Sequence, residues 1–295
     1  MTTKTWQAKQ GQTRALAAGL HIVATPIGNL RDITLRALDA LAMADVIACE
    51  DSRVTARLLT AYGIDTPRTP YHEHNAQSAR PKLIARMKAG EAVALVTDAG
   101  TPLISDPGYK LALEARDEGI AVTTLPGPSA PVTALVLSGL PSDSFFFAGF
   151  APPRQGARRQ AIAAVADVPG TLVFFESAKR LAAFLKDALT VLGPRTAAVT
   201  RELTKMHEEI ARGTLAELAE RYARDGAPRG EVVVVIGAAT AEAEGDALAR
   251  LDDALDAALA AGGSLRDAVD RVAAETGLAR RKVYARALAR NGGQP

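Results

Sequence analysis

The residues with the clearest chemical potential lie in the segment Val93–Gly108, which reads VALVTDAGTPLISDPG. Its apolar, β-branched start predicts a buried parallel strand that ends at Val96. The turn-rich part that follows, with Asp98 and Gly100, would then lie at the carboxyl end of the strand, where open α/β sheets bind their ligands. Glycine there permits close backbone approach or positive φ. The segment therefore predicts a ligand-binding loop.

Six further polar clusters follow predicted strands or begin predicted helices. They are Thr25–Leu30, Glu50–Arg53, Tyr71–Asn75, Pro126–Ala130, Phe174–Arg180 and Arg201–Glu209. Any one of them could be a plain surface turn or a capped helix start. Because they recur at strand ends in two α/β halves, together they favour a ligand cleft between two domains.

Two of these clusters hold candidate acids and bases. Asp51 or Ser52 is expected to cap a helix, which leaves Glu50 and Arg53 for substrate binding. His72 and His74 have a spacing that metal sites use, but the chain has only 4 histidines and 1 cysteine. Polar recognition or base chemistry is therefore expected there, and no metal site.

Composition narrows the class of protein. The chain has 295 residues, a formal charge of +2 and a single cysteine, Cys49. This excludes an internal disulfide and the strong positive field of an obligate polyanion binder, so nucleic-acid contacts would need local patches. Cys49 follows an apolar run and is expected to be a buried small hydrophobe. Without a signal peptide or a bilayer-length apolar run, the expected location is the cytoplasm.

Known nucleotide and hydrolase signatures are missing from the sequence. It contains no GxGxxG fingerprint, no Walker A motif and no GxSxG elbow. A nucleotide-hydrolysing P-loop enzyme and an α/β-hydrolase are therefore not expected.

The elements that must position these clusters alternate along the chain. After a loose tail (1–18), residues 19–140 alternate strands with helices, which predicts an α/β domain with a parallel sheet. Residues 141–238 predict a second α/β domain with a mixed sheet, in which 208–212 pairs with 231–236. A linker then leads to residues 246–295.

The C-terminal residues 246–295 predict a small helical domain. Ser264 and Asp267 have the spacing of a capping-box variant, and two short helices around Gly277 resemble a helix-turn-helix. Five cations gather in the last helix without an intervening acid: Arg280, Arg281, Lys282, Arg286 and Arg290. Either a solvated helix face or a polyanion contact would explain them.

Seven motifs in this order resemble those of the bacterial 16S rRNA (cytidine) 2'-O-methyltransferases, within the tetrapyrrole (corrin/porphyrin) methylase superfamily. They are TPIGNLRDIT, EDSRVTARLL, YHEHN, VTDAGTPLISDPG, LPGPSA, FFESAKR and RELTKMHEE. The resemblance covers about Leu20 to Ala238, and the C-terminal helices resemble the small domain added in that family. Ser52 stands where the family usually has Thr, and Ala178-Lys179 where it usually has Pro-His.

The resemblance implies two α/β domains of tetrapyrrole methylase type with S-adenosylmethionine in a cleft between them, a small helical C-terminal domain, and a homodimer. Carried over by motif, the residues that bind the donor would be Gly28, Asp98, Gly100, Leu103, Ile104, Ser105, Ser129, Ala130, Phe174 and Met206. Of these, Phe174 and Met206 would flank the adenine.

The function implied is methylation of a ribose 2'-hydroxyl of a decoding-centre cytidine in 16S rRNA of the small ribosomal subunit. Candidates for a base near that hydroxyl are Glu50, Asp51 and His72. The candidates for RNA contact are Arg53, Lys179, Arg180, Arg201, Lys205, Arg280, Arg281 and Lys282. Two alternatives remain open: a tetrapyrrole-precursor C-methyltransferase of the same superfamily, and a non-enzymatic RNA-binding module.

Overall fold

The computed structural model describes residues 16–103, 108–239, 241–261, 264–276, 278 and 280–290, with side chains of 241–250 and Lys282 left out. The predicted tail therefore lies almost wholly outside the described residues. The chain divides into two compact units, Met1–Ala130 and Pro131–Pro295, so the division falls before the boundary expected near residue 140. The cleft expected between two domains stays a prediction.

The first unit contains a five-stranded sheet, called sheet 1 here, in the order β3-β2-β4-β1-β5. Every pairing in it is parallel, as the alternation of strands and helices predicted. The strands are β1 (Gly19–Val23), β2 (Val46–Cys49), β3 (Arg68–Pro70), β4 (Ala92–Val96) and β5 (Val122–Leu125). Parallel pairing places all five carboxyl ends at one edge, which is where the predicted polar clusters follow the strands.

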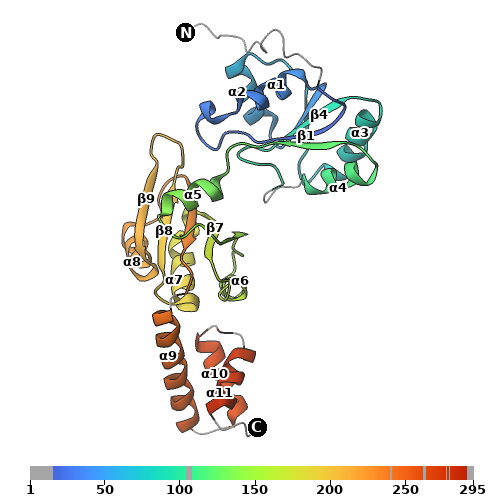
Figure 1. Cartoon of the computed structure of the whole chain (residues 1–295). Coiled ribbons are helices and arrows are strands. Elements are labelled where there is room, and N and C mark those ends of the chain that lie inside the picture. The colour runs from blue at the N-terminus through green and yellow to red at the C-terminus, as the bar shows by residue number, and fades with distance from the viewer. Residues whose placement is uncertain are drawn as a thin grey trace. The chain divides into compact units, whose positions relative to one another are not determined.

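Helices cover both faces of sheet 1 (Figure 1). The first face packs against α1 (Leu35–Met43) and α2 (Ser52–Tyr62), and the second against α3 (Ala76–Lys88) and α4 (Tyr109–Asp117). Burial on both sides explains why the central strands β2 and β4 are apolar throughout rather than alternating. The pair Asp106-Pro107 before α4 is typical of a cap followed by a first-turn proline, but both lie outside the described residues.

The second unit contains a mixed sheet, sheet 2, in the order β6-β7-β10-β8-β9. Its strands are β6 (Phe145–Phe150), β7 (Thr171–Ser177), β8 (Thr196–Arg201), β9 (Glu209–Thr214) and β10 (Glu231–Ile236). The mixed sheet was predicted, but the predicted pairing of β9 with β10 is wrong: β8 lies between them and pairs with both. The apolar run of β10 needs a central place, whereas the half-polar β9 suits an edge.

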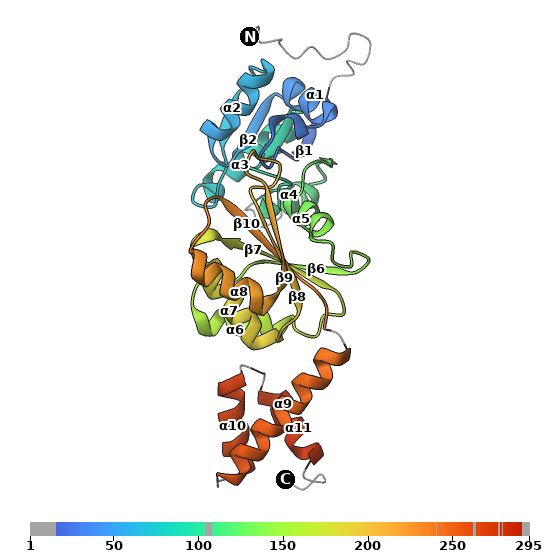
Figure 2. The same ribbon diagram turned by 90° about the vertical axis from the view of Figure 1, so that its left-hand side faces the viewer.

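Three helices bury the main core of the second unit on one face of sheet 2. They are α6 (Gln155–Ala164), α7 (Leu181–Leu192) and α8 (Leu215–Asp225), and Figure 2 shows them together beside the fan of strands. No helix was predicted over the residues of α6, whose N-cap Arg154 makes no side-chain cap. On the opposite face, Arg212 donates to the carbonyls of Leu137 and Ser138 and so fastens the end of α5 (Ala130–Ser138) to β9.

The C-terminal segment is helical, as predicted. It consists of α9 (Ala241–Ala260), α10 (Leu265–Thr276) and α11 (Arg280–Arg290), which share a small apolar core around Leu255, Val269 and Val283. The predicted cap is present, because the Asp267 amide donates to the Ser264 hydroxyl at 3.2 Å and the Ser264 amide to the Asp267 carboxylate at 3.0 Å. Among the described residues, no helix has the length and apolarity to cross a membrane.

Candidate functional site

The carboxyl edge of sheet 1 is held together by bonds between the loops that follow its strands. Thr25, after β1, and Gly100, after β4, exchange two backbone hydrogen bonds of 2.9 and 3.0 Å. The Thr25 hydroxyl donates to the Thr97 carbonyl at 3.0 Å, and the Thr101 hydroxyl to the Pro128 carbonyl, after β5, at 3.2 Å. Thr25 begins one of the predicted polar clusters and Thr101 adjoins the predicted site residue Gly100, but no role was predicted for either hydroxyl.

Gly100 has a φ of +82°, which only glycine adopts at little cost. A Cβ there would lie 3.5 Å from the Ile27 side chain, so the backbone conformation and not space demands the glycine. Leu103, at the end of the described part of this loop, has a φ of +73°, a strained value for a residue with a side chain. The neighbouring Ile104 and Ser105 lie outside the described residues.

Asp98, after β4, and Asp51, after β2, are linked. The half-buried Asp98 carboxylate accepts the Asp51 amide at 3.0 Å. The Asp51 carboxylate in turn caps α2 by accepting the Arg53 amide at 2.8 Å and forms an ion pair with the Arg53 guanidinium at 2.7 Å. These bonds from Arg53 lower the pKa of Asp51 to about 2. The structure thus confirms the capping role of Asp51 and leaves its carboxylate a weak base.

The two other candidate bases lie at adjacent strand ends. Glu50 is exposed and accepts the Thr97 hydroxyl at 3.3 Å. His72 follows β3, and its amide donates to the Asn75 side chain at 2.9 Å. Its ring is half-buried, and its Nδ1 is buried without a hydrogen-bond partner among the described residues. Since β2 and β3 are neighbours, Glu50 and His72 share one stretch of this edge.

Other predicted donor-binding residues of the first unit lie at the same edge. Gly28 is exposed in the loop after β1, and the half-buried Ser129 and Ala130 follow β5 at the start of α5. The edge thus brings together the first unit's described site residues from the ends of five strands. No three His, Cys, Asp or Glu side chains form a metal-binding group in the described parts of the chain.

Phe174 and Met206, the two residues of the second unit expected to flank the adenine, differ in their exposure to solvent. Phe174 is only 2% exposed and packs against Phe184 in the core, with ring centroids 5.1 Å apart. The Phe174 side chain therefore contributes to core packing, and a role beside the adenine stays a prediction that this burial does not favour. Met206 is 93% exposed in the loop between β8 and β9, where a ligand could reach it.

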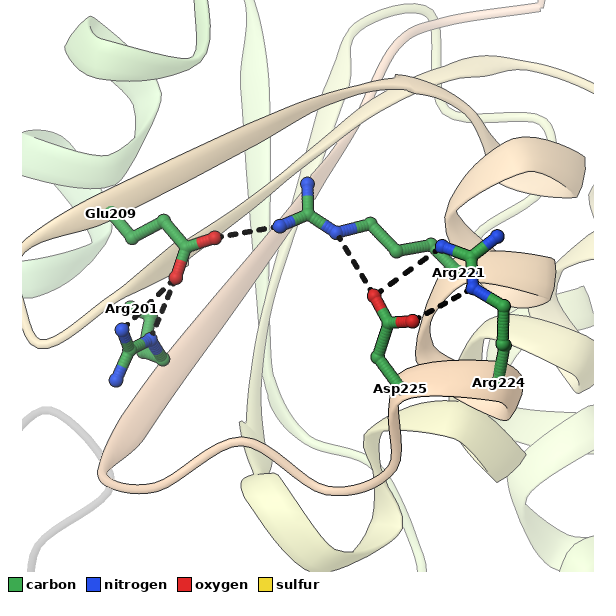
Figure 3. A network of polar contacts seen from close by, with 5 residues as sticks. All are labelled: Arg201, Glu209, Arg221, Arg224 and Asp225. Carbon is green, nitrogen blue, oxygen red and sulfur yellow. Dashed lines mark hydrogen bonds and ion pairs between the residues drawn. The ribbon is translucent and has the colours of Figure 1, made fainter.

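Most predicted RNA contacts of the second unit already have partners. The Arg180 guanidinium lies 2.6 Å from the fully buried Glu176 carboxylate. Arg201 bonds Glu209 at 3.0 Å, and Lys205 bonds Glu202 and Glu231 at 2.8 and 3.0 Å. Figure 3 shows that Glu209 also bonds Arg221, which continues to Asp225 and Arg224. Of the four cations predicted here, Lys179 makes no side-chain bond to a described residue.

The cations of the last helix are also paired, contrary to their isolation in the sequence. Arg280 bonds Asp270 of α10, while Arg286 and Arg290 bond Asp252 of α9 at 2.6 and 2.8 Å. The acids lie on other helices, so sequence spacing within α11 could not show them. Arg281 is exposed and makes no ion pair with a described residue, and the side chain of Lys282 lies outside the description.

Two family profiles together cover most of the chain. Residues 19–219 match the Tetrapyrrole (Corrin/Porphyrin) Methylases, and residues 240–291 match the RsmI C-terminal HTH domain. Solved structures agree on the fold. A cobalt precorrin-4 methyltransferase superposes with a TM-score of 0.57 at 18% identity, over 74% of this chain and 94% of its own. Uroporphyrin-III C-methyltransferase from Thermus thermophilus, complexed with S-adenosylhomocysteine, gives 0.53 at 20% identity, over 74% and 97%.

Relatives with curated names share more of this chain's sequence than these solved structures do. A ribosomal RNA small subunit methyltransferase I from Mesorhizobium japonicum is 52% identical over 283 residues, which are 94% of this chain and 95% of the relative. One from Halalkalibacterium halodurans is 43% identical over 90% and 93% of the two chains. The chain is therefore a methyltransferase of the tetrapyrrole (corrin/porphyrin) methylase family, and within it belongs with the ribosomal RNA small subunit methyltransferases I.

Proposed function

We propose that this protein uses S-adenosylmethionine to methylate a ribose 2'-hydroxyl of a decoding-centre cytidine in 16S rRNA. The observation that carries the proposal is the 52% identity to a small-subunit rRNA methyltransferase along nearly the whole chain, C-terminal helices included. The bonded carboxyl edge of sheet 1 supports it, because the loops with the family-like motifs meet there.

The residues of this edge fit such a donor. Gly100 and Leu103 hold left-handed backbone conformations, and strain such as that at Leu103 gathers where loops are shaped for a ligand. Asp98 offers a half-buried carboxylate that would accept hydrogen bonds from ribose hydroxyls or from an ammonium group. Gly28, Ser129 and Ala130 would line the remainder. When bound, the donor supplies an electrophilic sulfonium methyl group.

The protein's part in the chemistry is to place the acceptor hydroxyl and to take its proton. Orientation of the ribose can supply much of the rate. We assign the base to Glu50 or His72, because Asp51 is occupied by the α2 cap and by Arg53, and its pKa of about 2 makes it a poor proton acceptor at neutral pH. Arg53, whose side chain is 88% exposed, is bonded to Asp51 and would contact a phosphate only by exchanging that bond.

The partner is the small ribosomal subunit or its RNA, in the cytoplasm. In the C-terminal helices, Arg281 is the best-placed of the described cations of α11 for a phosphate, because Arg280, Arg286 and Arg290 are held by aspartates. A homodimer is also proposed. Large apolar side chains stand exposed on the edge strand β6 and on α5, as a subunit interface would require: Phe145, Phe146, Phe150, Val132 and Val136.

Two other functions remain as outcomes of one experiment. The purified protein is incubated with labelled S-adenosylmethionine and, in parallel, small-subunit RNA, assembled small subunits and a porphyrinoid precursor. Mass mapping of the RNA should find one ribose-methylated cytidine. Label in the porphyrinoid alone would establish the C-methyltransferase, and RNA binding without donor binding would establish a non-enzymatic module.

A further inference from the structure

One end of sheet 2 gathers the charged side chains of four strands, and we call it the polar rim: residues 176–180, 201–209 and 229–231. Register places them together, since Ser177 pairs with Glu231 and Arg201 with both Val232 and Glu209. The two motif-bearing loops of the second unit both belong to this rim. Its chemistry therefore bears on what the second unit binds.

Most cations of the polar rim serve the rim itself. Arg180 is anchored on the buried Glu176, and Arg201 bonds both the Glu209 carboxylate and, at 3.1 Å, the carbonyl of Arg229. Lys205 bridges Glu202 and Glu231. Their charge is neutralised by carboxylates that hold them in place, so they are poorly suited to take up a phosphate without first breaking a bond.

The Glu202 loop of the rim is rigidly built. Glu202 and Thr204 have φ values of +51° and +64°, in the left-handed region. Glu202 accepts the Glu231 amide at 3.1 Å and donates its own amide to the Glu231 carbonyl at 3.0 Å, while the Thr204 amide donates to Glu208 at 2.7 Å. The start of β10, and with it Arg229, is thereby fixed relative to β8.

Lys179 and Arg229 are different from these neighbours. Both side chains are exposed, and neither makes a hydrogen bond or ion pair with a described residue. Each lies two residues from one partner of the Ser177–Glu231 pair, a chain distance of at most about 7 Å. Two cations without a carboxylate partner among the described residues thus lie at one end of sheet 2, where hydrogen bonds of the Glu202 loop fix the backbone.

We propose that Lys179 and Arg229 are the residues of the polar rim that contact the RNA backbone, and that Arg201 and Lys205 are positioning residues that brace it. The proposal rests on the proposed RNA substrate. Phosphate contacts from exposed lysine and arginine position a protein on nucleic acid and supply most of the salt dependence of binding. Arg229 was not singled out in the sequence, because it lies in a polar turn outside the recognisable motifs.

The test measures affinity for small-subunit rRNA across a salt series, with the full chain and with Lys179→Ala, Arg229→Ala and the double variant. Each single variant should weaken binding about fivefold and flatten the slope of log affinity against log salt by about 0.7 to 0.9; the double variant should lose about 25-fold. Lys179→Arg should bind as the unmodified protein does. S-adenosylmethionine affinity, measured by calorimetry, should not change.

Arg224→Ala is the matched control, because Arg224 is also an exposed cation but is bonded to Asp225. It should stay within about twofold of the unmodified protein. Equal losses in Arg224→Ala and Arg229→Ala would overturn the proposal by showing a general charge effect, and so would an unchanged double variant. If the unmodified protein instead failed to methylate the RNA at all, the proposed function itself would be wrong.

Discussion

The carboxyl edge of sheet 1 and the polar rim of sheet 2 differ in how much of their polar chemistry is ion pairing, although the edge also contains the Asp51–Arg53 pair. At the edge of sheet 1, Asp98 and Thr25 bond backbone groups of neighbouring loops, and their carboxylate and hydroxyl shape a surface. At the polar rim, carboxylates bond guanidinium groups and neutralise them (Figure 3). The comparison teaches that a cation at a strand end is a candidate for contact with a phosphate chiefly where no carboxylate already holds it.

The largest expected effect is at Asp98. Asp98→Ala removes the acceptor of the Asp51 amide, and with it the carboxylate proposed to bind the methyl donor. S-adenosylmethionine affinity should therefore fall about 100-fold, in line with the loss of a charge-assisted hydrogen bond. Asp98→Asn, which keeps one oxygen, should lose less. Calorimetry measures both, and donor affinity retained in Asp98→Ala would show that this edge does not bind the donor.

A smaller effect is expected at Gly100. Gly100→Ala should destabilise the first unit by about 1 to 2 kcal/mol, because an alanine at a φ of +82° is strained. Gly90→Ala is the matched control, since Gly90 has a φ of +93° with open space around it. Thermal unfolding should detect both losses, whereas donor affinity should fall only in Gly100→Ala. Equal donor affinity in the two variants would show that the backbone conformation at Gly100 does not affect donor binding.

Glu209→Gln, in the polar rim, should lower the stability of the second unit and leave donor affinity unchanged. The variant weakens the bonds of Glu209 to Arg201 and Arg221, and half-exposed pairs of this kind contribute about 1 kcal/mol or less. Urea unfolding measures that loss, and calorimetry should find donor affinity unchanged. A large fall in donor affinity would make the rim part of the donor site and erase the contrast between the two sheets.

The smallest expected effect is on the stability of the folded chain at acidic pH. The folded state lowers the pKa of Asp51 to about 2, chiefly through bonds from Arg53, below the value of about 3.9 in an unfolded chain. The carboxylate therefore adds stability above pH 4, and that contribution is lost as the pH falls from about 4 to 2. Asp51→Asn should lack this part of the acid dependence in unfolding experiments between pH 2 and 5. Its rate of methylation near neutral pH should keep the same pH profile if Asp51 is not the base.

Sequence reasoning succeeded where the signal was local. The buried strand ending at Val96, the parallel sheet of the first unit and the Ser264 cap depend on apolar runs and on residues within one turn of each other. It failed for the partner of β9 and for the missed helix α6, because strand order depends on which strand must be buried on both faces, and α6 lacks a side-chain cap.

The sequence by itself determined the order of the elements, the motif-bearing loops and the family, because these follow from residue types and short spacings. Only the tertiary structure decided which side chains remain available to a ligand. Phe174 is enclosed by Phe184, Arg201 is held by Glu209 and Arg286 by Asp252. The partner of a side chain is set by which elements pack together in space, and neither the type of a residue nor its position in the chain specifies that partner.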